Sequence, residues 1–320
     1  MKKDNRIQLL RGIAILAIIL IHTCPRGPAR ILIRPFLNYG VALFLFLSGY
    51  LTQIKDGSLF SFYKKRIIRV LFPYVIWTIV YTLLFQDYSR IPFNLITART
   101  SAHFYFIPVY IQFVLLTPLI IKLAHTRYRW AGWIIAPLAS LLFIYLPAIS
   151  HQELPDKVAI VWNICCLGWF TFYYLGIYLR ANDRENPPTT NRLGFFLSCA
   201  ILLQIAEGFL LQHLNYFDPG IQLKFSALLT NSIILVICYH WLHKPQQEPG
   251  DRNLFVITGN YSFGIYLTHL MIQTFLFNIT GFSAIPFPIT SAIVFILSFA
   301  LVFILGQICG KSFSRILGLQ

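Results

Sequence analysis

The stretch Arg11-Gly-Ile-Ala-Ile-Leu-Ala-Ile-Ile-Leu-Ile-His22 lies in the first hydrophobic segment of the chain, with only apolar or small residues between the arginine and the histidine. In an α-helix, steps of about 100° bring both side chains to one face, about 16 Å apart along the axis. Ionisable groups in a membrane-spanning helix are costly and usually face a bundle interior or a wet cavity. The alternative is that Arg11 snorkels to the lipid headgroups and that His22 marks the far end of the segment.

The composition indicates an integral membrane protein. The 320 residues are 57% hydrophobic and 12% charged, with a mean hydropathy of +0.66, whereas soluble chains have about 25% charged residues. The net charge of +15 indicates cytoplasmic loops beside anionic headgroups and an anionic cofactor, and we expect no nucleic acid partner. No cleavage site follows the first apolar segment, so we expect it to remain as a membrane anchor. The cysteines have no metal-ligand spacing, so we expect no metal site.

Apolar runs of about 17 to 25 residues, the length of a membrane span, recur along the whole chain. They predict an all-α integral membrane protein, a polytopic bundle of about ten transmembrane helices, forming a single domain over residues 1–320. The predicted segments are 7–23, 37–54, 70–86, 104–122, 130–147, 158–179, 193–211, 221–242, 254–278 and 287–309.

Lys and Arg are unevenly distributed between the two sides of the membrane. With the N-terminus in the cytoplasm, roughly three times as many of these residues fall on the cytoplasmic side as on the outer side. The bias predicts that both termini are cytoplasmic and that Arg11 lies toward the cytoplasm and His22 toward the outside. One outer loop contradicts the bias with three arginines, Arg26, Arg30 and Arg34. Either these arginines steer an anionic acceptor or the loop is simply solvated.

Two further stretches carry candidate site residues. In the run Phe44-Leu-Phe-Leu-Ser48-Gly49, two small residues permit a close approach between helices, and the Ser48 hydroxyl can bond within the bundle. In the basic loop that follows, Arg66 and Arg69 are neighbours on one helical turn. Guanidinium groups suit phosphate, and two together can hold a pyrophosphate or a 3′-phosphate. The alternative is an ordinary positive-inside anchor.

In order and spacing, Arg11-x10-His22, the Phe44–Gly49 run and Arg66-x-x-Arg69 resemble the acyltransferase-3 family of integral membrane acyltransferases. The family pattern in the second helix begins with paired Phe; here Leu replaces the second, a departure that affects packing. The resemblance reaches most of the chain, because ten helices are what such a domain supplies.

Two later stretches are also similar to this family. They are His103-Phe-Tyr-Phe-Ile-Pro108, which we expect near the outer surface, and Tyr261-Ser-Phe-Gly-Ile-Tyr266-Leu-Thr-His269, inside a span. We take His103, Tyr266 and His269 as substrate-binding candidates. His269 either lines the site or is hydrogen-bonded inside the bundle. Glu207 is a further intramembrane ionisable group, either a substrate-site residue or the partner of a buried cation.

The resemblance implies that the chain moves an acyl group, commonly acetyl from acetyl-CoA, to a hydroxyl of a cell-surface or lipid-linked glycan. This places it among the lipids of the bacterial inner membrane, in cell-envelope chemistry. A neutral imidazole can take the proton of an alcohol near pH 7, so we assign His22 as the general base; a transient acyl carrier is the alternative. Arg11, the second catalytic candidate, is too far from His22 to orient it, and we expect it to bind the CoA arm. Arg66, Arg69 and Ser48 would hold the nucleotide end.

A transporter or flippase of polysaccharide or lipid-linked intermediates is a competing interpretation, because such proteins also need intramembrane Arg and His. The sequence shows neither an inverted repeat nor matching broken helices between its halves, which argues against it.

Overall fold

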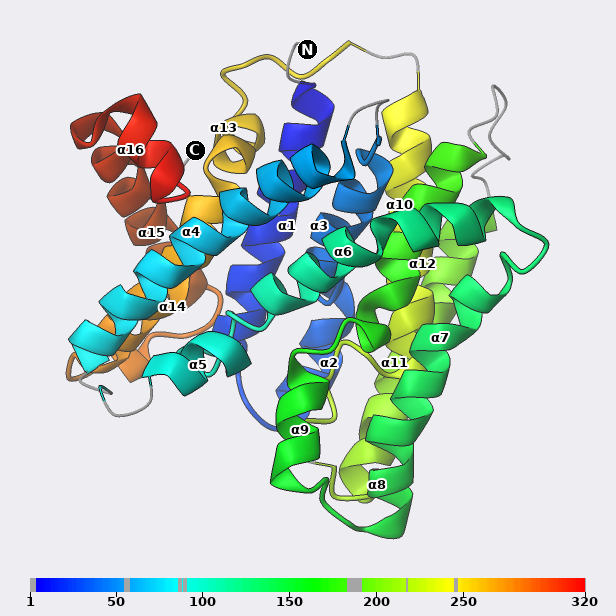
Figure 1. Cartoon of the computed structure of the whole chain (residues 1–320). Coiled ribbons are helices and arrows are strands. Elements are labelled where there is room, and N and C mark those ends of the chain that lie inside the picture. Colours follow the sequence, from blue (N-terminus) through cyan, green and yellow to red (C-terminus); the bar gives the residue numbers. More distant parts are fainter. Residues whose placement is uncertain are drawn as a thin grey trace.

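The computed structural model describes residues 4–54, 58–85, 88, 91–182, 192–216, 218–244 and 247–319. This described part of the chain is helical throughout and contains no strand (Figure 1). The all-α fold predicted from the apolar runs is therefore confirmed. Both ends of the chain lie at the same end of the molecule (Figure 1).

Eight helical segments within the described residues have the length and apolar composition of a membrane span. They are Asn5–Thr23 (α1), Pro28–Tyr50 (α2, η1 and α3), Leu59–Phe85 (α4), Phe106–His125 (α6), Ala131–Ser150 (α7, η3 and α8), Leu193–His213 (α11), Phe225–His243 (α12) and Ile289–Ile308 (α15). A ninth span forms if Asp156–Asn163 (α9) and Leu167–Ala181 (η4 and α10) are counted together. The shorter elements are α5 (Ile91–Thr97), α13 (Leu254–Asn260), α14 (Ser262–Phe277), η6 (Phe282–Ala284) and α16 (Gly310–Ile316).

Two of the predicted spans are broken helices. The segment predicted over 158–179 bends by 40° between α9 and α10. The side-chain amide of Gln112 satisfies the backbone at this break, because its Nε2 donates to the carbonyl of Ile164 at 2.6 Å and its Oε1 accepts from the N–H of Cys166 at 3.1 Å. The segment predicted over 254–278 divides at Tyr261 into α13 and α14. With 16 residues, α14 is about 24 Å long, shorter than a typical hydrocarbon core of about 30 Å.

Helix α4 differs most from its prediction. It begins at Leu59 instead of near residue 70 and has 27 residues. Arg66 and Arg69 therefore lie within the helix and not in a loop before it. A helix of this length extends about 40 Å, more than the hydrocarbon thickness, and it runs obliquely across the bundle (Figure 1).

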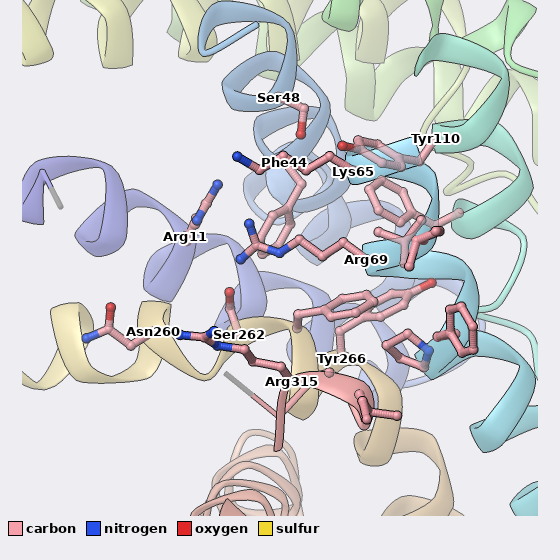
Figure 2. Close-up of a pocket in the computed structure, with 18 of the residues that line it drawn as sticks. Arg11, Phe44, Ser48, Lys65, Arg69, Tyr110, Asn260, Ser262, Tyr266 and Arg315 are labelled. Atoms are coloured by element: carbon pink, nitrogen blue, oxygen red, sulfur yellow. The ribbon is translucent and has the colours of Figure 1, made fainter. Parts of the chain in front are cut away.

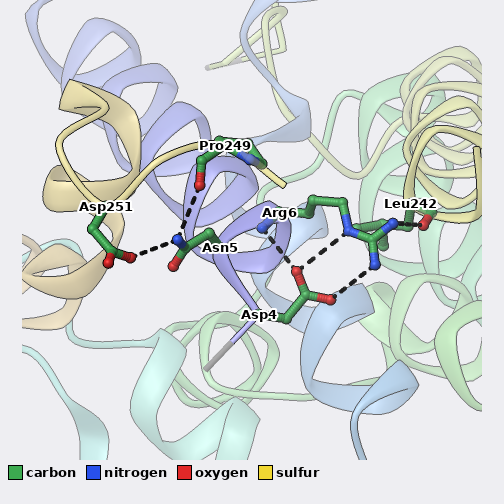
Figure 3. Close-up of polar contacts among 6 residues, drawn as sticks. All are labelled: Asp4, Asn5, Arg6, Leu242, Pro249 and Asp251. Carbon is green, nitrogen blue, oxygen red and sulfur yellow. Dashed lines mark hydrogen bonds and ion pairs between the residues drawn. The ribbon is translucent and has the colours of Figure 1, made fainter. Parts of the chain in front are cut away.

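Helix α1 lies inside the bundle, where it contacts α3, α13, α14 and α15. Its first turn is fixed by side-chain bonds to distant segments (Figure 3). Asn5 Nδ2 donates to the carbonyl of Pro249 at 2.9 Å and to Asp251 Oδ1 at 2.7 Å. Arg6 donates to the carbonyl of Leu242 at 2.8 Å, and Asp4 caps the helix by accepting from the Arg6 N–H. These bonds set the position of the Arg11–His22 face.

Helix α3 packs closely against α10, as the small residues of its sequence predict. A Cβ added at Gly49 would lie 2.3 Å from the carbonyl oxygen of Tyr173, so only glycine fits this contact. The predicted close helix approach at Gly49 is thus confirmed, and it fixes the height of Ser48 in the bundle.

Candidate active site

Five basic side chains line one cavity, at the end of α1 that carries Arg11. The cavity has a volume of about 1080 Å³, just above the usual range of about 300–1,000 Å³ for ligand sites. Its cations come from α1, α4 and α16, and they are Arg11, Lys64, Lys65, Arg69 and Arg315 (Figure 2). Neither Asp nor Glu occurs among the described residues that line it. We call this space the basic cavity; its charge suits an anion, and its guanidinium groups suit phosphate oxygens.

Three of the predicted donor-site residues meet in the basic cavity. Arg11 points into it from α1, and Arg69 reaches toward it from α4 (Figure 2). Ser48 lines the same cavity from α3, near the hydroxyl of Tyr110 on α6. Residues that are widely separated in the sequence are thus brought to one space.

Arg66 is not among the residues that line the basic cavity. Its guanidinium carbon lies 5.0 Å from the ring centroid of Phe62, one turn earlier in α4, a cation–π contact at the helix surface. The structure therefore separates Arg66 from Arg69, although the sequence pairs them.

Arg315 is a site residue that sequence reasoning missed, because it reads as an ordinary basic residue after the last span. It belongs to α16, which packs against α4. The indole N–H of Trp77 holds this segment in place by donating to the carbonyl of Leu317 at 3.0 Å. Tertiary packing of the C-terminal segment brings the arginine to the cavity, and no local motif could have indicated it.

His22 lines a second cavity of about 800 Å³, toward the other end of α1. We call it the His22 cavity. Aromatic residues form much of its wall, namely Tyr105, Phe143, Trp162, Trp169 and Tyr216. Several of these rings are stacked in pairs, with Tyr105 on Trp169 at 5.8 Å and Phe143 on Trp162 at 4.6 Å between centroids. Carboxylates and amides complete the lining, namely Glu153, Asp156, Asp218, Gln152, Asn163, Asn215 and Gln222.

Two arginines of the stretch predicted as the first outer loop, Arg30 of α2 and Arg34 of η1, share one carboxylate partner. Arg34 Nη1 lies 2.9 Å from Asp218 Oδ2, and Arg30 Nη1 lies 3.3 Å from Asp218 Oδ1. The Arg34 side chain is only 8% exposed, and both Arg34 and Asp218 line the His22 cavity. Arg34 is therefore part of a cavity wall and not of a freely solvated loop, whereas Arg26 is exposed.

His22 forms a cluster with two other histidines from separate segments, His269 and His103. The ring of His269 on α14 lies 5.2 Å from that of His22, and the ring of His103 lies 4.9 Å from that of His269, between centroids. His103 is 1% exposed, so its side chain is buried inside the bundle. Burial and the neighbouring His269 lower the pKa of His103 well below its ordinary value. This imidazole is therefore neutral at pH 7.

The hydrogen bonds of the cluster fix one tautomer. His269 Nδ1 lies 2.7 Å from the carbonyl oxygen of Tyr266; because a carbonyl only accepts, Nδ1 carries the hydrogen and Nε2 is left as an acceptor. His269 Nε2 is buried without a protein partner in the described structure. His269 is therefore hydrogen-bonded inside the bundle and also contacts His22, so both of the alternatives given for it from the sequence describe it in part. Tyr266 lines the basic cavity, and its hydroxyl donates to the carbonyl of His103.

Glu207 lines neither cavity among the described residues. Its carboxylate accepts from the Ser226 N–H at 3.0 Å, from the Ser226 hydroxyl and from the Tyr145 hydroxyl. These bonds cap the first turn of α12, so the structure places Glu207 at a helix N-terminus. The buried Lys224 nearby donates instead to the carbonyls of Gln204 and Pro219, at 2.8 and 3.0 Å.

The basic cavity and the His22 cavity share part of one wall. Ile18 of α1 and Val41 of α3 line both. Arg11 and His22 are thus residues of two adjoining cavities, approached from opposite ends of α1.

Comparison with known families identifies the family of the chain. A family model described as an acyltransferase domain, the acyltransferase-3 family, matches residues 4–307, and the chain belongs to that family. Neither the curated proteins nor the solved structures contain a match to the chain. The family identifies a membrane protein for which acyl transfer is plausible, and the geometry of the two cavities suggests how such a transfer would proceed.

Proposed function

We propose that the chain is an O-acyltransferase that moves an acetyl group from acetyl-CoA to a hydroxyl of a cell-surface or lipid-linked glycan. The observation that carries the proposal is that Arg11 and His22, on one face of α1, line two cavities that share a wall. A donor that enters one cavity and an acceptor that enters the other would meet near His22. We place the basic cavity and both termini at the cytoplasmic side of a bacterial inner membrane, following the distribution of Lys and Arg.

The basic cavity is the proposed donor site. Acetyl-CoA carries several phosphates, and Arg69, Arg315 and the two lysines of α4 supply charge-assisted hydrogen bonds to such groups. Arg11 lies deeper along α1 and would contact the pantetheine arm or a phosphate on its way in. The thioester would then point toward the shared wall.

The His22 cavity is the proposed acceptor site. Sugars present apolar C–H faces and rings of hydroxyls. Stacked aromatic rings such as Tyr105 and Trp169 suit the faces, and the carboxylates and amides suit the hydroxyls. Arg34, held by Asp218, would donate further hydrogen bonds to oxygen atoms of the acceptor.

His22 is the proposed general base. Its imidazole takes the proton of the acceptor hydroxyl as the oxygen attacks the thioester carbonyl, so that a new C–O bond forms. The C–S bond then breaks, and the imidazolium returns the proton to the departing thiolate of CoA. His269 Nε2, held as an acceptor by the Tyr266 carbonyl, would orient the other ring nitrogen of His22.

Mass spectrometry after incubation with isotopically labelled acetyl-CoA and a glycan extract tests the proposal. With the wild type, we expect label on the glycan and none on the protein. With His22→Ala, we expect no label on either the glycan or the protein. His213→Ala is a matched control, because this histidine is exposed and lines neither cavity. Label on the protein that depends on His22 would indicate that His22 carries the acyl group covalently and does not act as a general base. No transfer by the wild type would contradict the proposed function.

A further inference from the structure

Ile18 and Val41 are the apolar side chains at the junction of the two cavities. We propose that they form the partition which the acyl group crosses, and that their bulk restricts the enzyme to short acyl chains. This inference rests on the proposed function, since it concerns the acyl group that passes from donor to acceptor.

The position of Ile18 on α1 is the first observation that supports this role. It follows Arg11 by seven residues and precedes His22 by four, so all three lie on one helical face. Along the axis, Ile18 lies about 10 Å from Arg11 and about 6 Å from His22. An acyl group moving along this face from Arg11 toward His22 must therefore pass Ile18.

The packing of α3 against α1 is the second observation. A Cβ added at Gly40 would lie 3.0 Å from Ile18 Cγ1 and 3.0 Å from the carbonyl oxygen of Ala14, so the two helices touch at the height of Ile18. Val41 is the next residue on α3. Ile18 is 3% exposed and Val41 is 5% exposed, and β-branched side chains of this kind have few rotamers available for moving aside.

The neighbouring elements divide in the same way. At the start of α6, Tyr105 lines the His22 cavity and the adjacent Phe106 lines the basic cavity. On α14, Tyr266 faces the basic cavity and His269 contacts His22. The partition thus continues around the junction, and Ile18 and Val41 are where the two spaces come closest. An acetyl group adds one methyl to the carbonyl, whereas a longer chain must displace one of these side chains.

Acyl-chain competition in membrane vesicles that carry the full chain tests the proposal. The probes are acetyl-, butyryl- and octanoyl-CoA, each labelled in the acyl group, and the envelope glycans of the vesicles serve as acceptors. We expect the wild type to prefer acetyl-CoA. Ile18→Ala and Val41→Ala should raise the butyryl-to-acetyl ratio of kcat/KM by about tenfold, because one methylene in a tight pocket is worth about 10- to 200-fold in discrimination.

Ile13→Ala is the matched control, since it makes the same substitution in the same helix at a residue that lines neither cavity. Its ratio should equal that of the wild type. Ile18→Val, a smaller deletion, gives an intermediate ratio and guards against loss of folding in the alanine variant. If the butyryl-to-acetyl ratio is unchanged in the Ile18 and Val41 variants while acetyl transfer is intact, the proposed role of these two residues is wrong and the proposed function stands. Equal use of all three donors by the wild type would also overturn it, whereas absence of any transfer would overturn the proposed function with it.

Discussion

The basic cavity and the His22 cavity are built from different kinds of structure. The basic cavity is lined mainly by long helices, with cations spaced along α1 and α4 and a further arginine from α16. The His22 cavity takes most of its lining from residues 143–163 and 214–223, where helices end, bend or connect. The proposed donor site therefore uses regular helical spacing, whereas the proposed acceptor site depends on connecting segments. Such segments can vary with the acceptor while the helices stay the same.

The largest expected effect separates chemistry from donor binding. His22→Ala should lower transfer by about 10²- to 10⁴-fold, the usual contribution of general base catalysis. Binding of labelled CoA should stay unchanged, because His22 does not line the basic cavity. Parallel measurement of transfer and of CoA binding checks both parts. Loss of CoA binding in this variant would remove the distinction between the two cavities.

The next largest effect should be on the KM for acetyl-CoA and not on the KM for the acceptor. Arg69→Ala should raise the KM for acetyl-CoA by about 10- to 100-fold, because a hydrogen bond to a charged group is worth about 1.5–3 kcal/mol. The acceptor KM should be unchanged. Arg127→Ala serves as the control, since this arginine is exposed and lines neither cavity. An effect of Arg69→Ala on the acceptor alone would reverse the assignment of the cavities.

A weaker effect should be seen on the KM for the acceptor and not on the KM for acetyl-CoA. Asp218→Asn removes the carboxylate that holds Arg30 and Arg34. The variant should raise the acceptor KM severalfold without changing the KM for acetyl-CoA, because Arg34 loses its fixed position in the His22 cavity. Separate titrations of glycan extract and acetyl-CoA measure this. A parallel rise in the KM for acetyl-CoA would show that the two cavities do not act independently.

The smallest effect on transfer is expected at Glu207. Glu207→Ala should destabilise the protein by about 1–3 kcal/mol, because the N–H of Ser226 and the hydroxyl of Tyr145 lose their acceptor. Transfer per folded molecule should stay within about twofold of the wild type, since capping groups act on stability and not on the reaction. Thermal unfolding in detergent and initial rates on the same preparation check this. A loss of transfer without a matching loss of stability would assign Glu207 to the proposed acceptor site.

The sequence predicted those parts of the site that follow helical periodicity. The placement of Arg11 and His22 on one face and the close approach at Gly49 follow from local spacing. The grouping of Ser48 with Arg69 came only from the family resemblance, because the two residues lie on different helices. The sequence did not predict Arg315, whose place depends on the packing of the C-terminal segment.

The break beside Gln112 was also not predictable. It depends on a side chain that is 52 residues away and pairs with the Ile164 carbonyl. The aromatic lining of the His22 cavity escaped prediction for a related reason, because it comes from connecting segments without a periodic pattern.

Determination of the structure with acetyl-CoA bound tests the central claim most directly. The account predicts phosphates within hydrogen-bond distance of Arg69 and Arg315, with the thioester directed past Arg11 toward Ile18. It also predicts that the His22 cavity stays free of nucleotide. A nucleotide seated among Trp162, Trp169 and Tyr216, on the His22 side of the partition, would contradict the account.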